Sequence, residues 1–306
     1  MDKKGFTKYL EGKSLAPVTI AYYEKSVESF FTRVKKGETE ISKPDILRYL
    51  EHLKNSRKQE NITRRNNLIA INHYFTLLYQ NEQITANPCS LLKIRGANKK
   101  RLYKIYTPDE LTGLADDFYA VFISGFCDSY LDEAKKQKSF LSRHRNYAML
   151  TFILFQGLPT NELPQINMND IDLNKARLTL NNRTLPIQAA QMGTLINYIK
   201  NIRPLFLDFC GETDQLFFSL SAEQYNKTFI KPLTKLTKQI KSINSNFVNF
   251  SQIRTSVITH WIKSEGLRKA QYLAGHRFIS STEKYVNNNL DGLIDDINKL
   301  HPFDFL

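Results

Sequence analysis

The chain has 306 residues, 42% hydrophobic and 24% charged, which is the composition of a globular protein with a sizeable core. Its longest strongly apolar stretch, residues 147–155, is far shorter than the roughly 20 residues of a membrane-spanning helix, and the first residues do not resemble a signal peptide. The three cysteines are isolated, which excludes a disulfide framework and a Cys-x-x-Cys metal site. We therefore expect a cytoplasmic protein with no membrane segment, no metal and no small-molecule cofactor.

The net charge of +13 is concentrated near the N-terminus. Residues 1–104 carry 21 Lys and Arg against 10 Asp and Glu, whereas the other 202 residues carry 22 against 20. This asymmetry indicates a polyanionic partner, with nucleic acid ahead of an anionic membrane surface. A basic surface kept for solubility is the alternative.

Three helices are expected in the first hundred residues. Pro17 can open the first, and Ser42 with Asp45 has the form of a capping box for the second. The third covers residues 63–79, and a short turn of helix is expected at residues 90–94. Together they predict a small helical domain.

A basic segment with one glycine follows at residues 95–104, and Thr107 begins a new helix. We place the boundary between two domains here, with residues 1–104 in the first and residues 105–306 in the second. The segment is either a solvated linker or a linker that lies along phosphates.

The second domain is expected to be mostly helical, with one β-hairpin in which leucines flank the turn at Asn181-Asn182. The expected helices cover residues 189–202, 222–241, 252–264, 267–274 and 290–300.

Two residues near the C-terminus, His276 and Tyr285, are nine positions apart. On one continuous helix they would lie on opposite faces. However, Gly275 is a natural helix stop, and Ser280 with Glu283 forms a capping-box pattern that predicts a new helix at the next residue. The chain therefore turns between His276 and Tyr285, so that both side chains can face one point.

Arg254, His276 and Tyr285 together would suit chemistry on a phosphate. Arginine can bind two nonbridging oxygens, histidine can hydrogen-bond an oxygen or carry a proton, and a tyrosine hydroxyl can attack phosphorus. Taken singly, each has a more common structural explanation: a surface charge, a capping group and a packing residue.

The segment IRTSVITHWIKSEGLRKAQYLAGHRFISSTEKY, residues 253–285, resembles the C-terminal signature of the tyrosine recombinases, the phage-integrase and Xer-type family. In that signature an H-x-L-R-H box precedes L-G-H, and the nucleophilic tyrosine follows nine residues later. Arg254 matches the box arginine, His276 the L-G-H histidine and Tyr285 the nucleophile. FILFQGLPTNELPQINMNDID is similar to the family's G-L-R-x-S-E-L stretch, and GANKKRLYKIYTPDEL to its interdomain linker, so the likeness covers nearly the whole chain.

The chain departs from the family pattern at several catalytic positions. Pro159 stands where the first catalytic arginine is expected, and Ser251 and Thr255 replace the two box histidines. Three arginines elsewhere are candidates for supplying the missing cation: Arg143, Arg145 and Arg277.

The expected hairpin lacks the family's catalytic lysine as well. Asn181-Asn182 occupies its place, and the flanking Lys175 and Arg183 match no family position, so neither receives a role.

The resemblance implies a mainly α fold, with a SAM-like helical core-binding domain followed by a mostly helical catalytic domain with a small β-hairpin. It implies a clamp around double-stranded DNA and a homotetramer on two DNA sites, in which the segment 290–300 reaches a neighbouring subunit. It also implies cleavage through a 3′-phosphotyrosine formed by Tyr285, without ATP or metal. Five basic residues are expected on the DNA: Arg64, Arg65, Lys99, Lys100 and Arg101. The missing catalytic groups leave two hypotheses: an active recombinase, and a DNA-binding relative with weak or no strand-exchange activity.

Overall fold

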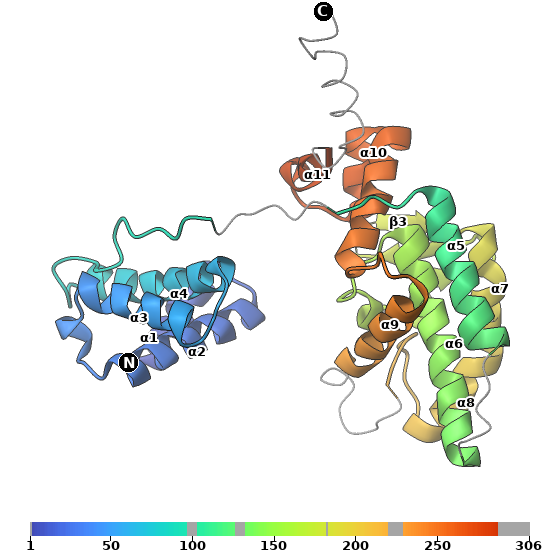
Figure 1. The fold of residues 1–306 in the computed structure, drawn as a ribbon, viewed down its shortest axis with the longest axis horizontal. Helices are drawn as coiled ribbons and strands as arrows, with labels where there is room; N and C mark the ends of the chain where they lie inside the picture. Colours follow the sequence, from blue (N-terminus) through green and yellow to red (C-terminus); the bar gives the residue numbers. More distant parts are fainter. Residues whose placement is uncertain (1, 97–102, 126–131, 182, 220–228, 287–306) are drawn as a thin grey trace, which may run out of the picture. The chain divides into compact units, whose positions relative to one another are not determined.

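The computed structural model describes residues 2–96, 103–125, 132–181, 183–219 and 229–286. Contacts within the chain divide it into two compact units, residues 1–101 and 102–306 (Figure 1). The expected fold class, mainly α with a small β-hairpin, is confirmed. Within the described ranges, no helix combines the length and the apolar character needed to span a bilayer.

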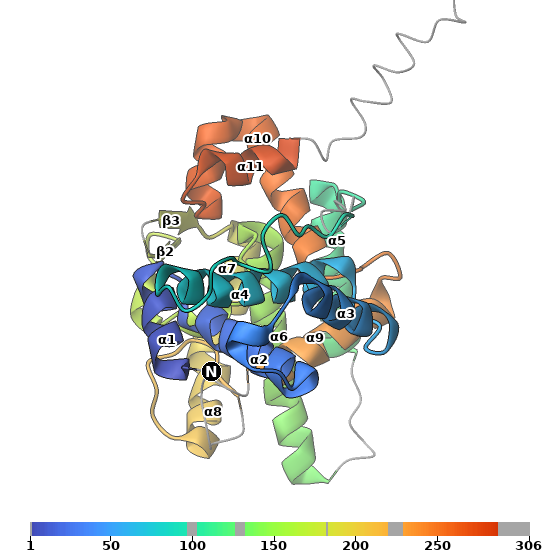
Figure 2. The same cartoon turned by 90° about the vertical axis from the view of Figure 1, so that its left-hand side faces the viewer.

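The first unit is a four-helix bundle of α1 (Lys3–Gly12), α2 (Pro17–Val34), α3 (Lys43–Asn55) and α4 (Asn61–Gln80), with a short 3-10 turn at Glu38–Glu40. Helix α4 contacts each of the other three helices (Figure 2). Pro17 opens α2, and Ser42 with Asp45 forms a capping box before α3, as their sequence positions predicted. The helical turn expected at residues 90–94 was wrong, because this stretch forms turns without a helix.

The second unit begins by docking onto its own last long helix. Before α5 (Pro108–Tyr119), the buried Tyr106 lies against α10 (Phe250–Ala274). Its amide donates a 2.9 Å hydrogen bond to the Ser256 hydroxyl, and its carbonyl lies 2.6 Å from Nε2 of His260. The entry segment therefore fixes α5 to the helix that carries Arg254.

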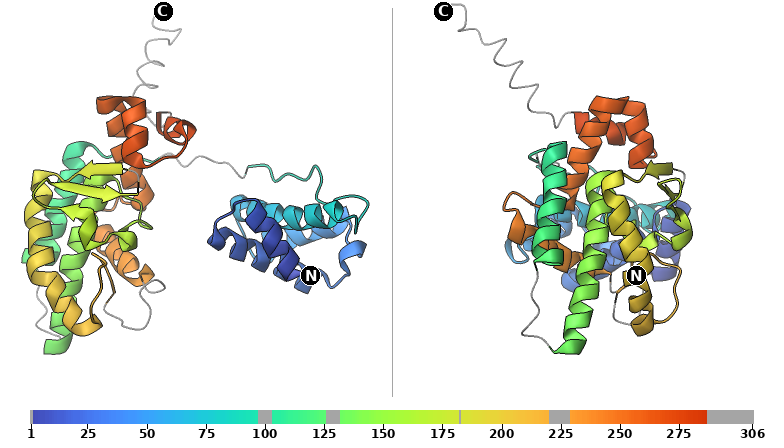
Figure 3. Two further views of the ribbon diagram at one scale, coloured as in Figure 1. Left: turned by 180° about the vertical axis from the view of Figure 1, so that it is seen from behind. Right: turned by 90° about the vertical axis from the view of Figure 1, so that its right-hand side faces the viewer.

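The long helix α6 (Glu133–Gln156) packs against most of the other helices of this unit. The other elements, in chain order, are the π-helical turn Ala120–Ser124, the 3-10 turns Leu163–Gln165 and Met168–Asp170, strands β1 (Ile171–Asp172), β2 (Arg177–Leu180) and β3 (Arg183–Pro186), α7 (Ala189–Asn197), the π-helical turn Tyr198–Ile202, α8 (Arg203–Cys210), α9 (Ile230–Ile243), α10 and α11 (Ile279–Val286). The three strands form an antiparallel sheet in the order β1-β2-β3, at the end of the helical layer where α10 lies (Figure 3).

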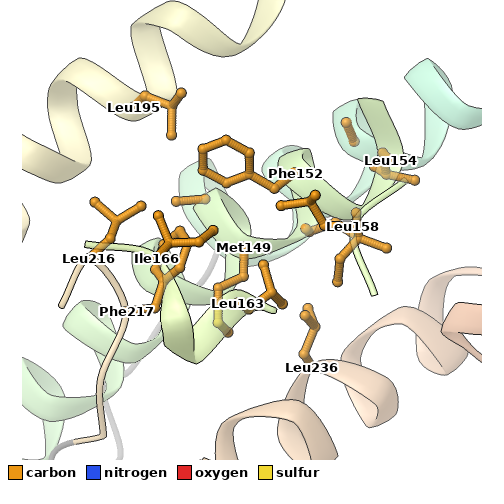
Figure 4. Packing of buried hydrophobic residues seen from close by; sticks show 14 of the residues in the cluster. Met149, Phe152, Leu154, Leu158, Leu163, Ile166, Leu195, Leu216, Phe217 and Leu236 are labelled. Atoms are coloured by element: carbon orange, nitrogen blue, oxygen red, sulfur yellow. The ribbon is translucent and has the colours of Figure 1, made fainter. Parts of the chain in front are cut away.

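The core of the second unit forms where α6 meets the segments on either side of it. Met149 and Phe152 of α6 pack with Leu163, Leu195 and Phe217, all of them fully buried (Figure 4). Burial of side chains of this size contributes about 1.5–3 kcal/mol each. This core holds the C-terminal end of α6, and the Gly157 that ends it, in a fixed position.

The predicted helix boundaries of the second unit are confirmed in part. The two helices expected at 252–264 and 267–274 are present as the two arms of α10, because Gly266, with φ 80° and ψ 165°, interrupts the helical conformation between them. Helix α11 begins at Ile279, so Ser280 lies inside it and is not its cap. The helix expected at 222–241 corresponds to α9, which begins at Ile230 after a turn at Phe229. Residues 220–228 and the segment 290–300 lie outside the described ranges.

Candidate active site

Arg254 lies on the first arm of α10, at the point where two other chain segments end. Its Nη1 donates to the carbonyl of Gly157 at the end of α6, and its Nη2 donates a 2.8 Å hydrogen bond to the carbonyl of Ala274. Both carbonyls belong to helix C-termini, where backbone oxygens lack helical partners and attract cations. Arg254 is thus held by two helix ends, which fixes the direction of its guanidinium.

His276 follows the second arm of α10, directly after Gly275, whose φ of 69° ends that helix in the left-handed conformation. Its Nδ1 lies 2.9 Å from the hydroxyl of the buried Thr282, and its Nε2 lies 3.4 Å from Nη2 of Arg254. A guanidinium donates and cannot accept, so Nε2 is the acceptor and Nδ1 carries the proton. The imidazole is therefore held in one tautomer, with its lone pair toward Arg254.

Tyr285 comes from α11, which packs against α10 (Figure 1). Its ring stacks on that of His276, with centroids 5.7 Å apart and planes at 14°. Tyr285 also lies near enough to the Arg254 guanidinium to act on the pKa of that group. The structure thus brings together the three residues that the sequence proposed for one point.

The electrostatics of this cluster keep His276 neutral. Burial, with Arg254, Arg183 and Lys284 nearby, lowers the pKa of His276 to about 4. Burial also lowers the pKa of Arg254, and contact with Tyr285 opposes that shift. Near neutral pH the site therefore holds a charged guanidinium beside an uncharged imidazole.

A second guanidinium, which the sequence analysis left without a role, lies beside this cluster. Arg183 begins β3, is 5% exposed, and pairs with Glu162 at 2.5 Å. The sequence contained a pattern that could have predicted its burial. Strand residues alternate between the two faces of a sheet, so Arg183 lies on the same face as Leu185, two positions on, which is buried. The alternation places Arg183 on the inward face, where an arginine needs a specific partner.

The three arginines considered as replacement cations have other surroundings. Arg145 is buried, donates to the Phe218 carbonyl and to Asn146, and lies over the Phe206 ring, so it belongs to the core. Arg143 is buried and donates to the Ser139 hydroxyl. Of these three arginines, Arg277 alone lines a cavity that lies beside His276, and its side chain is exposed.

The predicted DNA-contacting residues are only partly described. Arg64 is half-buried near the start of α4 and donates from Nε to the Leu50 carbonyl at 3.1 Å, so it also ties α3 to α4. Arg65, its half-buried neighbour, lines a groove of about 780 Å³ in the first unit. Lys99, Lys100 and Arg101 lie outside the described residues.

Comparison with known proteins identifies the family. The sequence pattern of the phage integrase family matches residues 129–291, which is more than half of the chain. The chain belongs to the phage integrase family. The pattern of the phage integrase N-terminal SAM-like domain matches residues 4–85, within the first unit of this integrase.

Relatives and solved structures of similar proteins cover nearly the whole integrase chain. Tyrosine recombinase XerC of Natranaerobius thermophilus is 24% identical, over 97% of this chain and 97% of the relative. Tyrosine recombinase XerD of Chlamydia muridarum is 22% identical, over 97% and 94%. The XerH site-specific recombinase, crystallised on its palindromic difH substrate after cleavage, aligns with a TM-score of 0.67 and 16% identity, over 94% of this chain and 81% of that one. The integrase of transposon Tn1549, in complex with circular intermediate DNA, aligns with a TM-score of 0.64 and 13% identity, over 92% and 94%.

Proposed function

We propose that this integrase cuts and rejoins double-stranded DNA by site-specific recombination, with Tyr285 as the nucleophile. The observation that carries the proposal is the position of the Tyr285 ring: it stacks on His276, whose Nε2 lies 3.4 Å from the Arg254 guanidinium. A nucleophile, a proton acceptor and a cation that can bind phosphate oxygens are the groups that such a reaction needs. Three groups from separate elements, α10, the turn after it and α11, meet at one point.

The reaction would proceed by two exchanges at phosphorus. The Tyr285 oxygen attacks the scissile phosphate, the bond from phosphorus to the 5′ oxygen breaks, and a 3′-phosphotyrosine and a 5′-hydroxyl result. The phenol proton passes to a base; neutral His276 is available for this once Arg254 turns from Nε2 to the phosphate, because the Nε2 lone pair is then free. Arg254 binds the nonbridging oxygens, where negative charge accumulates in the transition state. The 5′-hydroxyl of a second strand then attacks the phosphotyrosine and reverses the step, so the bond energy is conserved.

DNA binding would use both units. The first unit, about residues 1–104, would act as a core-binding domain, with Arg64 and Arg65 near the backbone and the basic segment at 99–101 between the units. We expect a homotetramer on two DNA sites, acting in the cytoplasm, with the segment 290–300 contacting a neighbouring subunit. Deletion of residues 288–306 should then impair pairing of two sites while leaving single-site binding intact. Unchanged recombination after the deletion would rule this role out.

Covalent trapping tests the chemistry. A target duplex is first selected from a randomised library with the purified protein, and nicked versions are made with the nick moved one nucleotide at a time. On a productive nick the short 5′ fragment diffuses away, so the protein remains attached to the 3′ end. Tyr285→Phe should abolish the adduct while retaining binding, whereas Tyr119→Phe, at an exposed tyrosine of α5, should retain both.

The alternative hypothesis, a DNA-binding relative without strand exchange, is favoured by Pro159 at the position of an expected arginine. That protein would shift the same duplex and form no adduct on any of the nicked substrates. An adduct that survives in Tyr285→Phe would also overturn the assignment of the nucleophile.

A further inference from the structure

Arg183 is a buried cation whose hydrogen bonds are incomplete. Its side chain is 5% exposed, and that of its partner Glu162 is 17% exposed. Its Nε, although buried, finds no hydrogen-bond partner among the residues that the structure describes. A guanidinium has five donors, and a buried donor left without an acceptor is costly. The site therefore holds a cation with donor capacity that Glu162 does not fill.

The position of Arg183 relative to His276 is fixed by Gly275. A methyl group added at Gly275 would lie 2.0 Å from Nη1 of Arg183, so the guanidinium lies against the backbone just before His276. The hydroxyl of Tyr272, on the second arm of α10, accepts a 2.9 Å hydrogen bond from the Thr184 amide and so ties β3 to that arm. Arg183 and Arg254 thus approach His276 from two different elements, β3 and the first arm of α10.

A cavity of about 450 Å³ opens beside Arg183 and His276. Its lining includes Arg183, Glu162, Gly275 and His276. Glu162 closes a turn with Pro159, because its amide donates a 3.0 Å hydrogen bond to the Pro159 carbonyl. Arg183 therefore reaches, from the hairpin, the same turn in which Pro159 stands at the position of an expected arginine.

The charges around His276 do not cancel. Arg254 and Arg183 contribute two positive charges, Glu162 contributes one negative charge, and His276 is neutral near pH 7, while the exposed Lys284 and Arg277 add further positive charge. Two partly desolvated cations repel each other strongly when water does not screen them. A phosphodiester would bring negative charge to this positively charged cluster.

We propose that Arg183 is the second phosphate-binding guanidinium of this site. It would contact a nonbridging oxygen of the scissile phosphate from β3, while Arg254 contacts the phosphate from α10 and Glu162 holds Arg183 in place. The role rests on the proposed function, since it assigns a further residue to the same reaction.

Binding of inorganic phosphate to the full chain tests the site without any strand cleavage. The NMR signals of the His276 ring report binding in the wild type, in Arg183→Gln and in Arg183→Lys. A charge-assisted hydrogen bond corresponds to about a 10- to 100-fold loss of affinity in Arg183→Gln, with a smaller loss in Arg183→Lys. Arg177→Gln is the matched control, because Arg177 is an exposed arginine of the same hairpin, and it should bind as the wild type does. Equal affinity in Arg183→Gln and Arg177→Gln would overturn the proposal.

Covalent trapping on a modified duplex separates phosphate contact from a structural role. Arg183→Gln should slow adduct formation by about 10²- to 10³-fold, the usual effect of losing one oxyanion donor. A methylphosphonate at the scissile position removes one nonbridging charge, so it should restore a large part of the rate in Arg183→Gln. A defect that stays the same on the neutral linkage would show that Arg183 acts only on folding. If the wild type forms no adduct while phosphate binding still depends on Arg183, the recombinase chemistry fails and the anion site stands.

Discussion

Gly275→Ala should damage the second unit through one steric contact. The glycine has a φ of 69°, where a side chain costs about 1–2 kcal/mol in any surroundings. The new methyl group would also lie 2.0 Å from Nη1 of Arg183, which must then move away from Glu162. Loss of that charge-assisted hydrogen bond adds about 1.5–3 kcal/mol. We therefore expect the free energy of unfolding to fall by about 3–5 kcal/mol, which is roughly 10 °C in Tm for a unit of this size.

Urea unfolding followed by tryptophan fluorescence measures this loss in the second unit alone, because Trp261 of α10 is the single tryptophan of the chain. The decisive comparison repeats Gly275→Ala in an Arg183→Ala background, where the steric contact is absent. There the substitution should cost only the backbone strain of about 1–2 kcal/mol. An equal cost in both backgrounds would refute the contact between Gly275 and Arg183.

Three further predictions follow from buried polar groups. Burial lowers the pKa of His276 to about 4, so the unfolded chain binds this proton at a higher pH than the folded chain does, and the free energy of unfolding should fall as the pH drops from 6.5 to about 4. Unfolding measured across that range should show a shallower fall in His276→Gln. An identical fall in that variant would contradict the low pKa. Ser256→Ala leaves the Tyr106 amide without its acceptor and should cost about 1–3 kcal/mol in urea unfolding. The hydrogen bond from Ser42 lowers the pKa of Asp45, so the stability that this carboxylate adds to the first unit should be lost as the pH falls below 3.8. Amide hydrogen exchange of Asp45→Asn should lack this acid-dependent loss.

Local patterns in the sequence predicted the helical elements because their causes are local. A proline opens α2 and a capping box opens α3, so both helices begin where their first residues allow. The glycine at 275 likewise ends α10, since a left-handed residue terminates a helix in any surroundings. Gly266 likewise separates the two arms of α10, which correspond to the two helices predicted from the sequence, because its φ of 80° and ψ of 165° are not helical.

The sequence alone predicted that Arg254, His276 and Tyr285 would lie on successive helices and on the turn after Gly275, because the ends of helices depend on local residues. Their common meeting point required the tertiary structure, since it depends on the packing of α11 against α10 and on two helix C-termini that hold Arg254. Matching of sequence motifs could not assign Arg183 to the site, because its position there also depends on tertiary packing. It is 71 residues from Arg254 along the chain, and only the docking of β3 against α10 brings its charge to His276.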